Sequence, residues 1–544
     1  MVVATATAPG AATGTLASLT SGVAGLDVAD PPATPPRPRG YDDEPGAVGN
    51  VLSTKVALAL SPSEDPPPRS GFPYVIPLKE LCLESVARAF ASDQSCLREG
   101  VLPEALRARI VDLLDVRLDI DLAGRWIADE AYWCRRARAR WPSLARPGFA
   151  PTARGRSWKQ MFFEKHVEEA IVASANDDDA ESLTHDEKNR NRRAESLDAT
   201  VRFASKWTRV LSLRGLRAGG GSVRLGSTLF EPLAGCLTSL TLQYGKKSAG
   251  VGYEPSAFGM AAADCEALAR CLPAAETLVR LSLPQNGLDC HRARIIAAGL
   301  GDNVSVTVLD LRANAIGCRG ARALAKLLDK RSVLRELELA DNAVGEEGAL
   351  ALARALRKNV SLRTLSLRLN AFVGDAGGEA LCDAIRKASV AGSTRLESVD
   401  LGACGLGPRA ARAAARMLRC ENSVLLSASF AGNDDFGPEA GGAFRAAFRG
   451  RVAAEAETAD AFEGSDAFSK TAATSFPPAF PSVRALEVRG CGFGEECEEA
   501  LEAAVRANRA RLEALGAAGL FPDRVSGVVT NAKFFENLRE ESHE

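Results

Sequence analysis

The residue types that most often carry out chemistry are few in this chain, and they do not form a catalytic or ligand-binding motif. Gly219-Gly220-Gly221 is a glycine run that lacks the Gly-Lys-Ser/Thr ending of a phosphate-binding loop. The sequence contains no Gly-x-Ser-x-Gly nucleophile elbow and no cluster with the spacing of metal ligands. His166 and His291 each stand alone on a helical stretch. We therefore predict a non-enzymatic protein with no catalytic residue, no bound metal and no other cofactor.

One stretch concentrates positive charge. Between residues 135 and 159 the chain carries eight basic side chains and no acidic one. They are Arg135, Arg136, Arg138, Arg140, Arg146, Arg154, Arg156 and Lys159. Such a stretch attracts an acidic polymer, for example a microtubule surface. The alternative is a solvated helix face followed by a flexible basic loop at 142–156.

The chain as a whole gives no sign of nucleic-acid or membrane binding. Its 67 basic and 69 acidic residues nearly balance, so no strongly basic surface is expected from the total charge. No window of the sequence has the length and apolar character of a transmembrane helix. The thirteen cysteines include no Cys-x-x-Cys pair, which favours a reducing, cytoplasmic compartment.

A repeat between residues 278 and 372 predicts the secondary structure that positions the side chains of this chain. Leucines recur every 28 residues in two columns, and an asparagine closes each block. The columns are Leu281, Leu309, Leu337, Leu365, then Leu283, Leu311, Leu339, Leu367, and finally Asn286, Asn314, Asn342, Asn370. This L-x-x-L-x-L-x-x-N pattern is typical of leucine-rich repeats and resembles their ribonuclease-inhibitor-like subclass. Cys404 and Cys491 stand where other repeats carry asparagine.

Each repeat is predicted to contain a short strand, a turn and a helix. The alternation in residues 309–312 gives a strand with one buried face. The period then becomes helical, and two apolar columns indicate one helix face against the sheet. These columns are Ile296, Leu324, Leu352, and four residues later Leu300, Leu328, Leu356. Because one unit cannot bury its own apolar face, the units must stack.

The fold class is therefore predicted to be α/β, a leucine-rich repeat solenoid with nine short parallel strands preceded by a small all-α domain. The strand cores are expected at Leu211, Leu240, Leu281, Leu309, Leu337, Leu365, Val399, Ala428 and Leu486. The exposed face of such a sheet is the usual binding surface of a solenoid. Its candidate protein-binding residues are Asp310, Arg312, Glu338 and Arg368. The alternative is an ordinary solvated ladder, because the charges are mixed and no aromatic residue lies among them.

Composition divides the chain into five segments. We predict a disordered N-terminal segment at 1–70, a helical domain at 72–172, a charged linker at 173–200, leucine-rich repeats at 201–510, and a C-terminal cap and tail at 511–544. Insertions on the rim of the solenoid are expected near 244–259 and 451–480, where the repeat spacing is longer. Leu512, Leu515 and Leu520 are expected to cover the open core of the last repeat.

The helical domain is predicted to have an aromatic core. Helices are expected at 77–90, 102–114 and 122–141, with another beginning near Ser157. Trp126, Trp133 and Trp141 share one face of the third helix and are expected to pack inside. Tyr132, Arg135, Arg136 and Arg140 fall off this stripe. We predict that these four side chains face a partner.

Two blocks in this domain are distinctive. Residues 127–141 read IADEAYWCRRARARW, and residues 157–166 read SWKQMFFEKH. Their combination of rare aromatic residues with fixed charges resembles the N-terminal region of the dynein regulatory complex subunit 5 family. In that family similar blocks precede leucine-rich repeats. The resemblance covers about residues 72–172 and extends, less specifically, through the repeats.

The resemblance implies a non-enzymatic subunit of the nexin–dynein regulatory complex of motile cilia and flagella. That complex links neighbouring doublet microtubules and restrains dynein-driven sliding. The implied partners are other subunits of the complex, with the doublet microtubule surface as a further candidate. The implied location is the axoneme, within the cytoskeleton of the cilium or flagellum.

Two other classes of protein remain as alternatives. The first is an F-box substrate receptor of a ubiquitin ligase, because such receptors often carry leucine-rich repeats. Its loose pattern consists of Leu102-Pro103-Glu104, Ile110, Leu113-Leu114, Trp126 and Trp133. The second is a GTPase-activating protein of the Ran type, which has similar repeats but usually an acidic tail. The acidic end of this chain, residues 536–544, is short for that class.

Overall fold

A computed structural model of the chain describes residues 77–98, 100–145, 151, 155–176, 187–216, 229–245, 259–329, 332–420, 423–449 and 482–517. The predictions for the N-terminal segment 1–70, for nearly all of the insertion at 244–259, and for the insertion at 451–480 lie outside these residues. The expected position of Leu520 also lies outside, the backbone of Leu515 lies within a helix, and Leu512 is buried.

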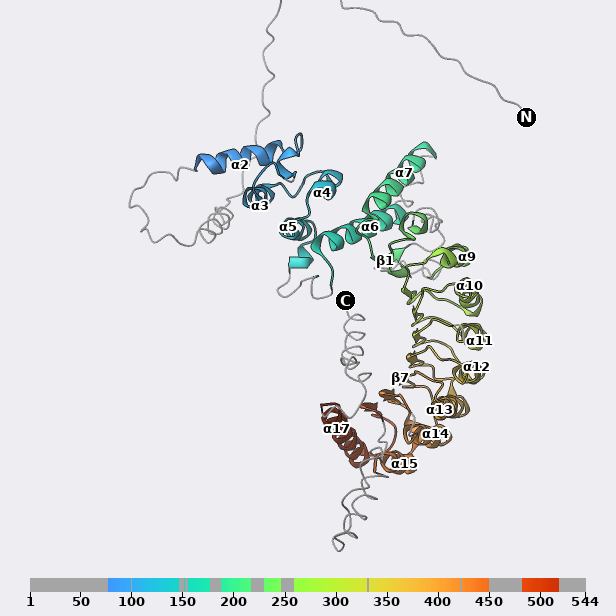
Figure 1. The fold of residues 1–544 in the computed structure, drawn as a ribbon. Coiled ribbons are helices and arrows are strands. Elements are labelled where there is room, and N and C mark those ends of the chain that lie inside the picture. The colour runs from blue at the N-terminus through green and yellow to red at the C-terminus, as the bar shows by residue number, and fades with distance from the viewer. Residues whose placement is uncertain are drawn as a thin grey trace, which may run out of the picture. The chain divides into compact units, whose positions relative to one another are not determined.

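The repeats form one parallel sheet of nine strands, as predicted. Neighbours in sequence are neighbours in the sheet (Figure 1). The strands are β1 (Val210–Leu216), β2 (Ser239–Tyr244), β3 (Arg280–Ser282), β4 (Val308–Asp310), β5 (Glu336–Glu338), β6 (Thr364–Ser366), β7 (Ser398–Asp400), β8 (Ser427–Ser429) and β9 (Ala485–Glu487). Leu281 pairs with Leu309, Leu309 with Leu337, and Leu337 with Leu365. All nine expected strand cores are confirmed in this register.

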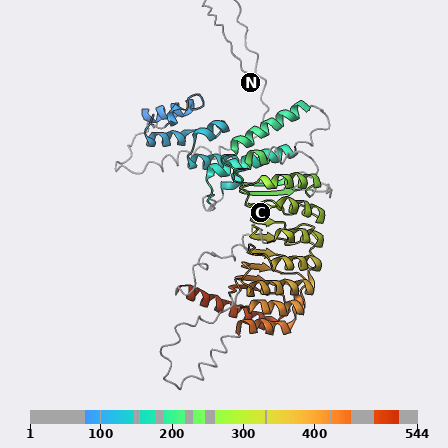
Figure 2. The same ribbon diagram turned by 45° about the vertical axis from the view of Figure 1, so that its right-hand side comes forward.

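The helices of the repeats are α9 (Ala262–Cys271), α10 (Cys290–Leu300), α11 (Cys318–Leu327), α12 (Glu346–Leu356), α13 (Gly374–Val390), α14 (Pro408–Leu418), α15 (Pro438–Arg449) and α17 (Glu495–Ala517), with the short α8 (Glu231–Leu233) before them. The helices α9 to α15 form one row along the same side of the sheet (Figures 1 and 2), and α17 follows the last strand. Both predicted helix columns are buried. The helices also approach closely, because a Cβ added at Gly299 would lie 2.6 Å from the Ala269 Cα atom.

A ladder of asparagines joins consecutive repeats. The Asn370 side chain donates to the carbonyl oxygens of Leu339 and Leu367 at 2.9 and 2.7 Å, and its Oδ1 atom accepts the Val344 N–H at 2.9 Å. Asn286, Asn314 and Asn342 bond in related ways. Cys404 and Cys491, which stand in place of asparagine, also belong to the ladder, since their Sγ atoms contact backbone oxygens at 3.1 and 3.2 Å. Buried backbone groups in the turns are thereby satisfied.

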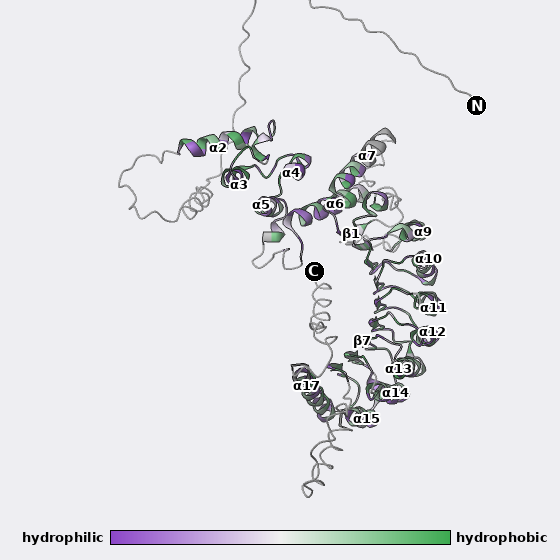
Figure 3. Ribbon diagram, in the orientation of Figure 1, coloured by the Kyte–Doolittle hydropathy of each residue, from purple (hydrophilic) through white to green (hydrophobic). Residues whose placement is uncertain are grey.

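The helical domain contains α2 (Leu78–Ala89), α3 (Glu104–Leu113), α4 (Ile120–Trp126), α5 (Glu130–Arg140), α6 (Trp158–Asn176) and α7 (Glu187–Ala204). Figure 3 shows hydrophobic and hydrophilic residues on the same helices, as amphipathic packing requires. The prediction of one continuous helix at 122–141 is wrong. Ile127 is extended, and the Asp129 side chain begins a new helix by accepting the Tyr132 N–H at 2.7 Å. An aspartate at this position is a preferred N-cap.

The prediction of a linker at 173–200 is also wrong for its described part. Helix α6 continues to Asn176, and α7 begins at Glu187 and packs against α6. Leu197, Val201 and Ala204 are buried along one face of α7. Their spacing of four and three residues is helical, but the surrounding charges conceal it.

Candidate functional site

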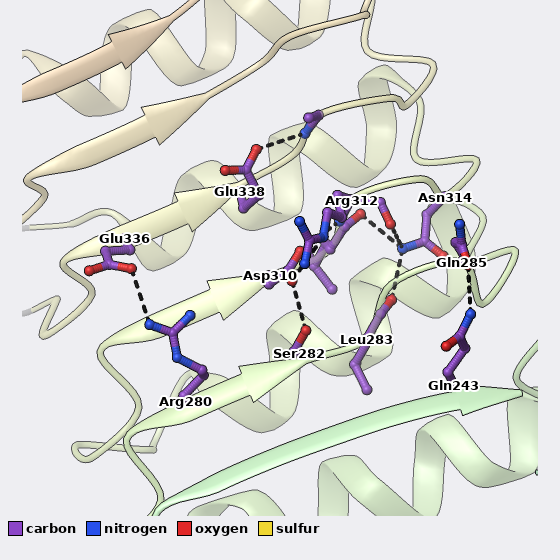
Figure 4. Close-up of polar contacts among 12 residues, drawn as sticks. Gln243, Arg280, Ser282, Leu283, Gln285, Asp310, Arg312, Asn314, Glu336 and Glu338 are labelled. Atoms are coloured by element: carbon purple, nitrogen blue, oxygen red, sulfur yellow. Dashed lines mark hydrogen bonds and ion pairs between the residues drawn. The ribbon is translucent and has the colours of Figure 1, made fainter. Parts of the chain in front are cut away.

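The sheet face of the solenoid holds the four charged residues that the sequence singles out, and Figure 4 shows three of them, Asp310, Arg312 and Glu338. Asp310 accepts a hydrogen bond from the Ser282 hydroxyl at 2.7 Å and lies 3.3 Å from the Arg312 Nε atom. Glu338, one strand further, accepts the Ala340 N–H at 3.3 Å. Arg368 lies two residues after the end of β6, and its guanidinium acts electrostatically on Asp400. Asp310 and Glu338 therefore lie on adjacent strands, and Arg312 and Arg368 lie just after the ends of β4 and β6. Asp310 is buried and is not free to contact a partner.

Burial alters the protonation of this surface. It raises the pKa of Glu338 to about 7, and the negative charges of Asp310 and Asp400 act in the same direction. It also raises the pKa of Asp400, against the effect of Arg368. Loss of solvent favours the neutral form of a carboxyl group. A partner that places a positive charge here would therefore find Glu338 partly protonated at neutral pH.

In the helical domain, the structure separates the four candidate residues into buried and accessible pairs. Tyr132 is fully buried and Arg136 is 9% exposed. The Arg136 guanidinium donates to the Tyr132 Oη atom at 3.0 Å and to the Leu118 carbonyl oxygen at 2.7 Å. It also lies over the rings of Trp133 and Phe162. The prediction that Tyr132 and Arg136 face a partner is therefore wrong.

The reason is that α5 is covered on more than one side. Helix α3 contacts it, and α6 packs against it. A buried guanidinium is acceptable here because oxygen atoms and aromatic faces surround it. The sequence pattern carried no signal of this, because an arginine off the aromatic stripe is normally a surface residue.

Arg135 and Arg140 remain partly accessible, but both already have partners. Arg135 donates to the carbonyl oxygens of Asp112 and Val111 at 2.6 and 2.8 Å, near the end of α3. Arg140 lies 2.8 Å from Glu169, and the side chains in this pair are 40% and 45% exposed. An exposed pair of this kind exchanges readily with solvent or a partner. Arg140 is thus the candidate in this domain that is most free to bind.

The rest of the basic stretch is also largely structural. Lys159 donates to the carbonyl oxygens of Gly124 and Ile127 at 2.8 and 2.9 Å, and burial lowers its pKa to about 8. Its ammonium group lies 4.5 Å from the centre of the Trp207 ring. Arg138 lies over Trp158 and is exposed. Arg146, Arg154 and most of the predicted loop at 142–156 lie outside the described residues.

The helical domain joins the solenoid through two glutamates that no sequence pattern marks. Glu164 on α6 accepts the backbone N–H groups of Arg209 and Val210 at 3.0 and 2.9 Å. Glu168, one turn later, accepts the Ser212 N–H at 2.6 Å, and burial raises its pKa to about 7. These N–H groups lie on and just before β1, the first strand of the sheet. Helix α6 therefore covers the edge that would otherwise stay open.

The described residues do not gather metal-ligating side chains into one site. Among them no group of three histidines, cysteines or carboxylates could hold a metal ion. The groove between α12 and α13 is lined by Glu379 and Asp383, but arginines pair with both. His166 stacks on Phe162, and burial lowers its pKa to about 4, so it stays neutral. No helix in the described ranges is long and apolar enough to cross a bilayer.

Comparison with known proteins supports the repeats and points to one group of relatives. The family described as "Leucine Rich repeat" matches residues 302–325, 332–353 and 358–382. Dynein regulatory complex subunit 5 of Chlamydomonas reinhardtii is 34% identical over 221 residues, which is 41% of this chain and 50% of that protein. The protein of the same name from Mus musculus is 31% identical over 248 residues, or 44% and 48% of the two chains. That from Macaca fascicularis is 31% identical over 297 residues, or 52% and 55%. The chain thus spans about half the length of the curated relatives it matches.

Proposed function

We propose that this chain, a leucine-rich repeat protein homologous to dynein regulatory complex subunit 5, is a non-enzymatic scaffold subunit of the nexin–dynein regulatory complex. In this role it lies on the axoneme of a cilium or flagellum and contributes to the control of dynein-driven motility. The observation that carries the proposal is the 34% identity to the Chlamydomonas reinhardtii subunit over 221 residues. A scaffold protein binds its partners through exposed surfaces rather than through a reactive centre. The sheet face and the helical domain provide such surfaces.

The contacts that we propose for the scaffold lie on two surfaces. On the sheet face, Arg312, Glu338 and Arg368 contact other subunits of the complex, and the buried Asp310 holds Arg312 in position. On the helical domain, Arg140 leaves its exposed ion pair with Glu169. It pairs instead with an acidic group of a neighbouring subunit or of the doublet microtubule. The junction at Glu164 and Glu168 supports this arrangement, because it ties the two surfaces together by hydrogen bonds rather than by a linker.

The proposal is tested by following the tagged full-length chain in a ciliated cell. We expect signal along the axoneme that persists after the membrane is removed with detergent. Nuclear or diffuse signal would contradict the proposal. Binding to the adaptor subunit of a ubiquitin ligase in a pull-down, without axonemal signal, would support the F-box alternative in its place.

A further inference from the structure

One repeat contains an extra residue on the rim of the solenoid. Residues 342–345 read Asn-Ala-Val-Gly, whereas residues 370–374 read Asn-Ala-Phe-Val-Gly. The valines of the two repeats, Val344 and Val373, are both fully buried, so the insertion does not disturb the core. The inserted residue, Phe372, is 74% exposed. The stacked repeats therefore carry an aromatic side chain that contributes little to the packing of the solenoid core.

A second large apolar side chain lies in the same loop. Leu369 is 50% exposed and has a φ of 60°. Four other repeats also carry a residue other than glycine at this position with positive φ, whereas the last two repeats have Gly432 and Gly490, with φ values of 73° and 68°. A left-handed conformation disfavours a residue with a Cβ atom, and glycine avoids this cost. An exposed leucine here therefore has an unfavourable backbone conformation, and burial of its side chain does not compensate for it.

Two exposed alanines accompany these side chains. Ala343 and Ala371 are exposed in the same two loops. The loops are adjacent, because a Cβ added at Gly345 would lie 3.6 Å from the Phe372 Cβ atom. We call Ala343, Leu369, Ala371 and Phe372 the rim patch. Exposed aromatic and aliphatic side chains gathered in this way are typical of interaction sites.

Negative charge borders the rim patch on one side. The Asp341 N–H donates to the Arg368 carbonyl oxygen at 2.7 Å, which places Asp341 beside Leu369. Glu346 and Glu347 follow Gly345 directly, and all three acidic residues are exposed. Glu347 lies 3.2 Å from Arg322 in an exposed pair. In the described part of the chain Asp341 and Glu346 form no ion pair.

We propose that the rim patch is a docking site for a basic amphipathic segment of another protein. The segment would place apolar side chains against Leu369 and Phe372, and lysine or arginine side chains beside Asp341 and Glu346. Charge complementarity selects this occupant over an acidic one. The inference rests on the proposed role as an interaction subunit, but it does not depend on which assembly the chain joins.

The site is tested with the full-length chain and two labelled peptides, one an amphipathic helix of leucine and lysine and the other of leucine and glutamate. Fluorescence anisotropy should show binding of the lysine peptide and little of the glutamate peptide. Deletion of Phe372, which restores the Asn-Ala-Val-Gly sequence of the preceding repeat, should weaken binding about tenfold. Leu369→Gly should weaken it in the same direction without loss of stability, because the new residue suits the backbone.

Two further variants separate the contributions and provide a control. Asp341→Lys combined with Glu346→Lys should weaken binding of the lysine peptide and reduce its salt dependence. Val304→Ser removes an exposed apolar side chain, 79% accessible, in the segment between α10 and β4, and should leave the affinity unchanged. Equal affinity for both peptides, or unchanged binding after deletion of Phe372 and in Leu369→Gly, would overturn the proposal.

The occupant in the cell is identified by a photo-crosslinking amino acid at position 372 of the full-length chain. We expect crosslinked peptides from another protein that combine apolar residues with lysine or arginine. Crosslinks to an acidic segment, or to a second copy of this chain, would overturn the proposal. Absence of the chain from the axoneme would count against the proposed function alone, since the peptide measurements decide the rim patch separately.

Discussion

Arg136 serves the core of the helical domain although it carries a full charge. Its donors reach the Tyr132 hydroxyl and the Leu118 carbonyl oxygen, and its plane lies near two aromatic rings. The cost of removing the charge from water is thus offset by hydrogen bonds and aromatic contacts. The side chain fixes α5 against the segment between α3 and α4.

Reversing this charge is therefore expected to unfold the helical domain. Arg136→Glu would place a carboxylate among carbonyl oxygens and aromatic faces, at a cost of about 3–5 kcal/mol. Thermal unfolding followed by circular dichroism measures the effect. The matched control is Arg140→Glu, which breaks one exposed pair and should cost no more than about 1 kcal/mol. Equal stability of the two variants would mean that Arg136 is not buried in solution.

Glu338 should make the stability of the solenoid depend on pH. Folding raises its pKa from 4.5 to about 7, so the folded protein binds more protons than the unfolded chain between these values. The free energy of unfolding then falls as the pH rises from 4.5 to 7. Glu338→Gln removes this contribution. From pH 4.5 to pH 7 we expect the free energy of unfolding of the variant to rise by about 1–2 kcal/mol relative to that of the wild type. The change is limited to this size because part of the side chain is accessible.

Urea unfolding at several pH values measures this difference. Ser366, Asp310, Asp400 and the Ala340 N–H act on the Glu338 carboxyl, and Glu168 contributes a slope of its own. The comparison of variant with wild type cancels the contribution of Glu168, which is far away on α6. A constant difference between the two proteins over this pH range would show that Glu338 titrates normally.

At the scale of elements, α6 is the end cap of the sheet. A parallel sheet that begins with an open strand presents unpaired N–H groups. Glu164, on helix α6, is 3% exposed and accepts hydrogen bonds from N–H groups at this edge. The Arg156 guanidinium lies 3.6 Å from its carboxylate. The same contact fixes the helical domain to the repeats. One element therefore satisfies the sheet edge and sets the position of the first domain.

Removing this carboxylate should loosen the junction. Glu164→Ala leaves the N–H groups of Arg209 and Val210 without an acceptor, at a cost of about 1–3 kcal/mol each. Hydrogen exchange measured by mass spectrometry should become faster in residues 209–213 and in α6, with β5 and β6 unchanged. Glu169→Ala, in the same helix but on the exposed side, is the matched control. Unchanged exchange in both variants would contradict the role of Glu164.

The repeats were predictable from sequence because their leucines recur with a fixed period and a fixed closing asparagine. Asn433 was not among the predicted ladder residues although Ala428 was an expected strand core, and it donates to the Leu401 and Phe430 carbonyl oxygens like the other ladder residues. The start of α5 had a local signal, the Asp129 N-cap. Glu164 and Arg136 had none, because only tertiary contacts decide that these charges are inside.

At the scale of the whole molecule, the described domains present two kinds of surface. The sheet face is polar and its charges largely satisfy one another, whereas the rim patch is apolar and has acidic neighbours. The first suits contacts whose specificity comes from charge, and the second suits contacts whose affinity comes from burial. A subunit that must connect several proteins would use both.

The central claim, that the chain is a scaffold subunit of the dynein regulatory complex, is tested most directly by its dependence on that complex. Quantitative mass spectrometry of isolated axonemes should find the chain at a constant ratio to the other subunits of the complex. In axonemes from cells that lack the complex, the chain should be lost together with those subunits. Retention of the chain at its normal amount in axonemes without the complex, or its absence from normal axonemes, would contradict the account.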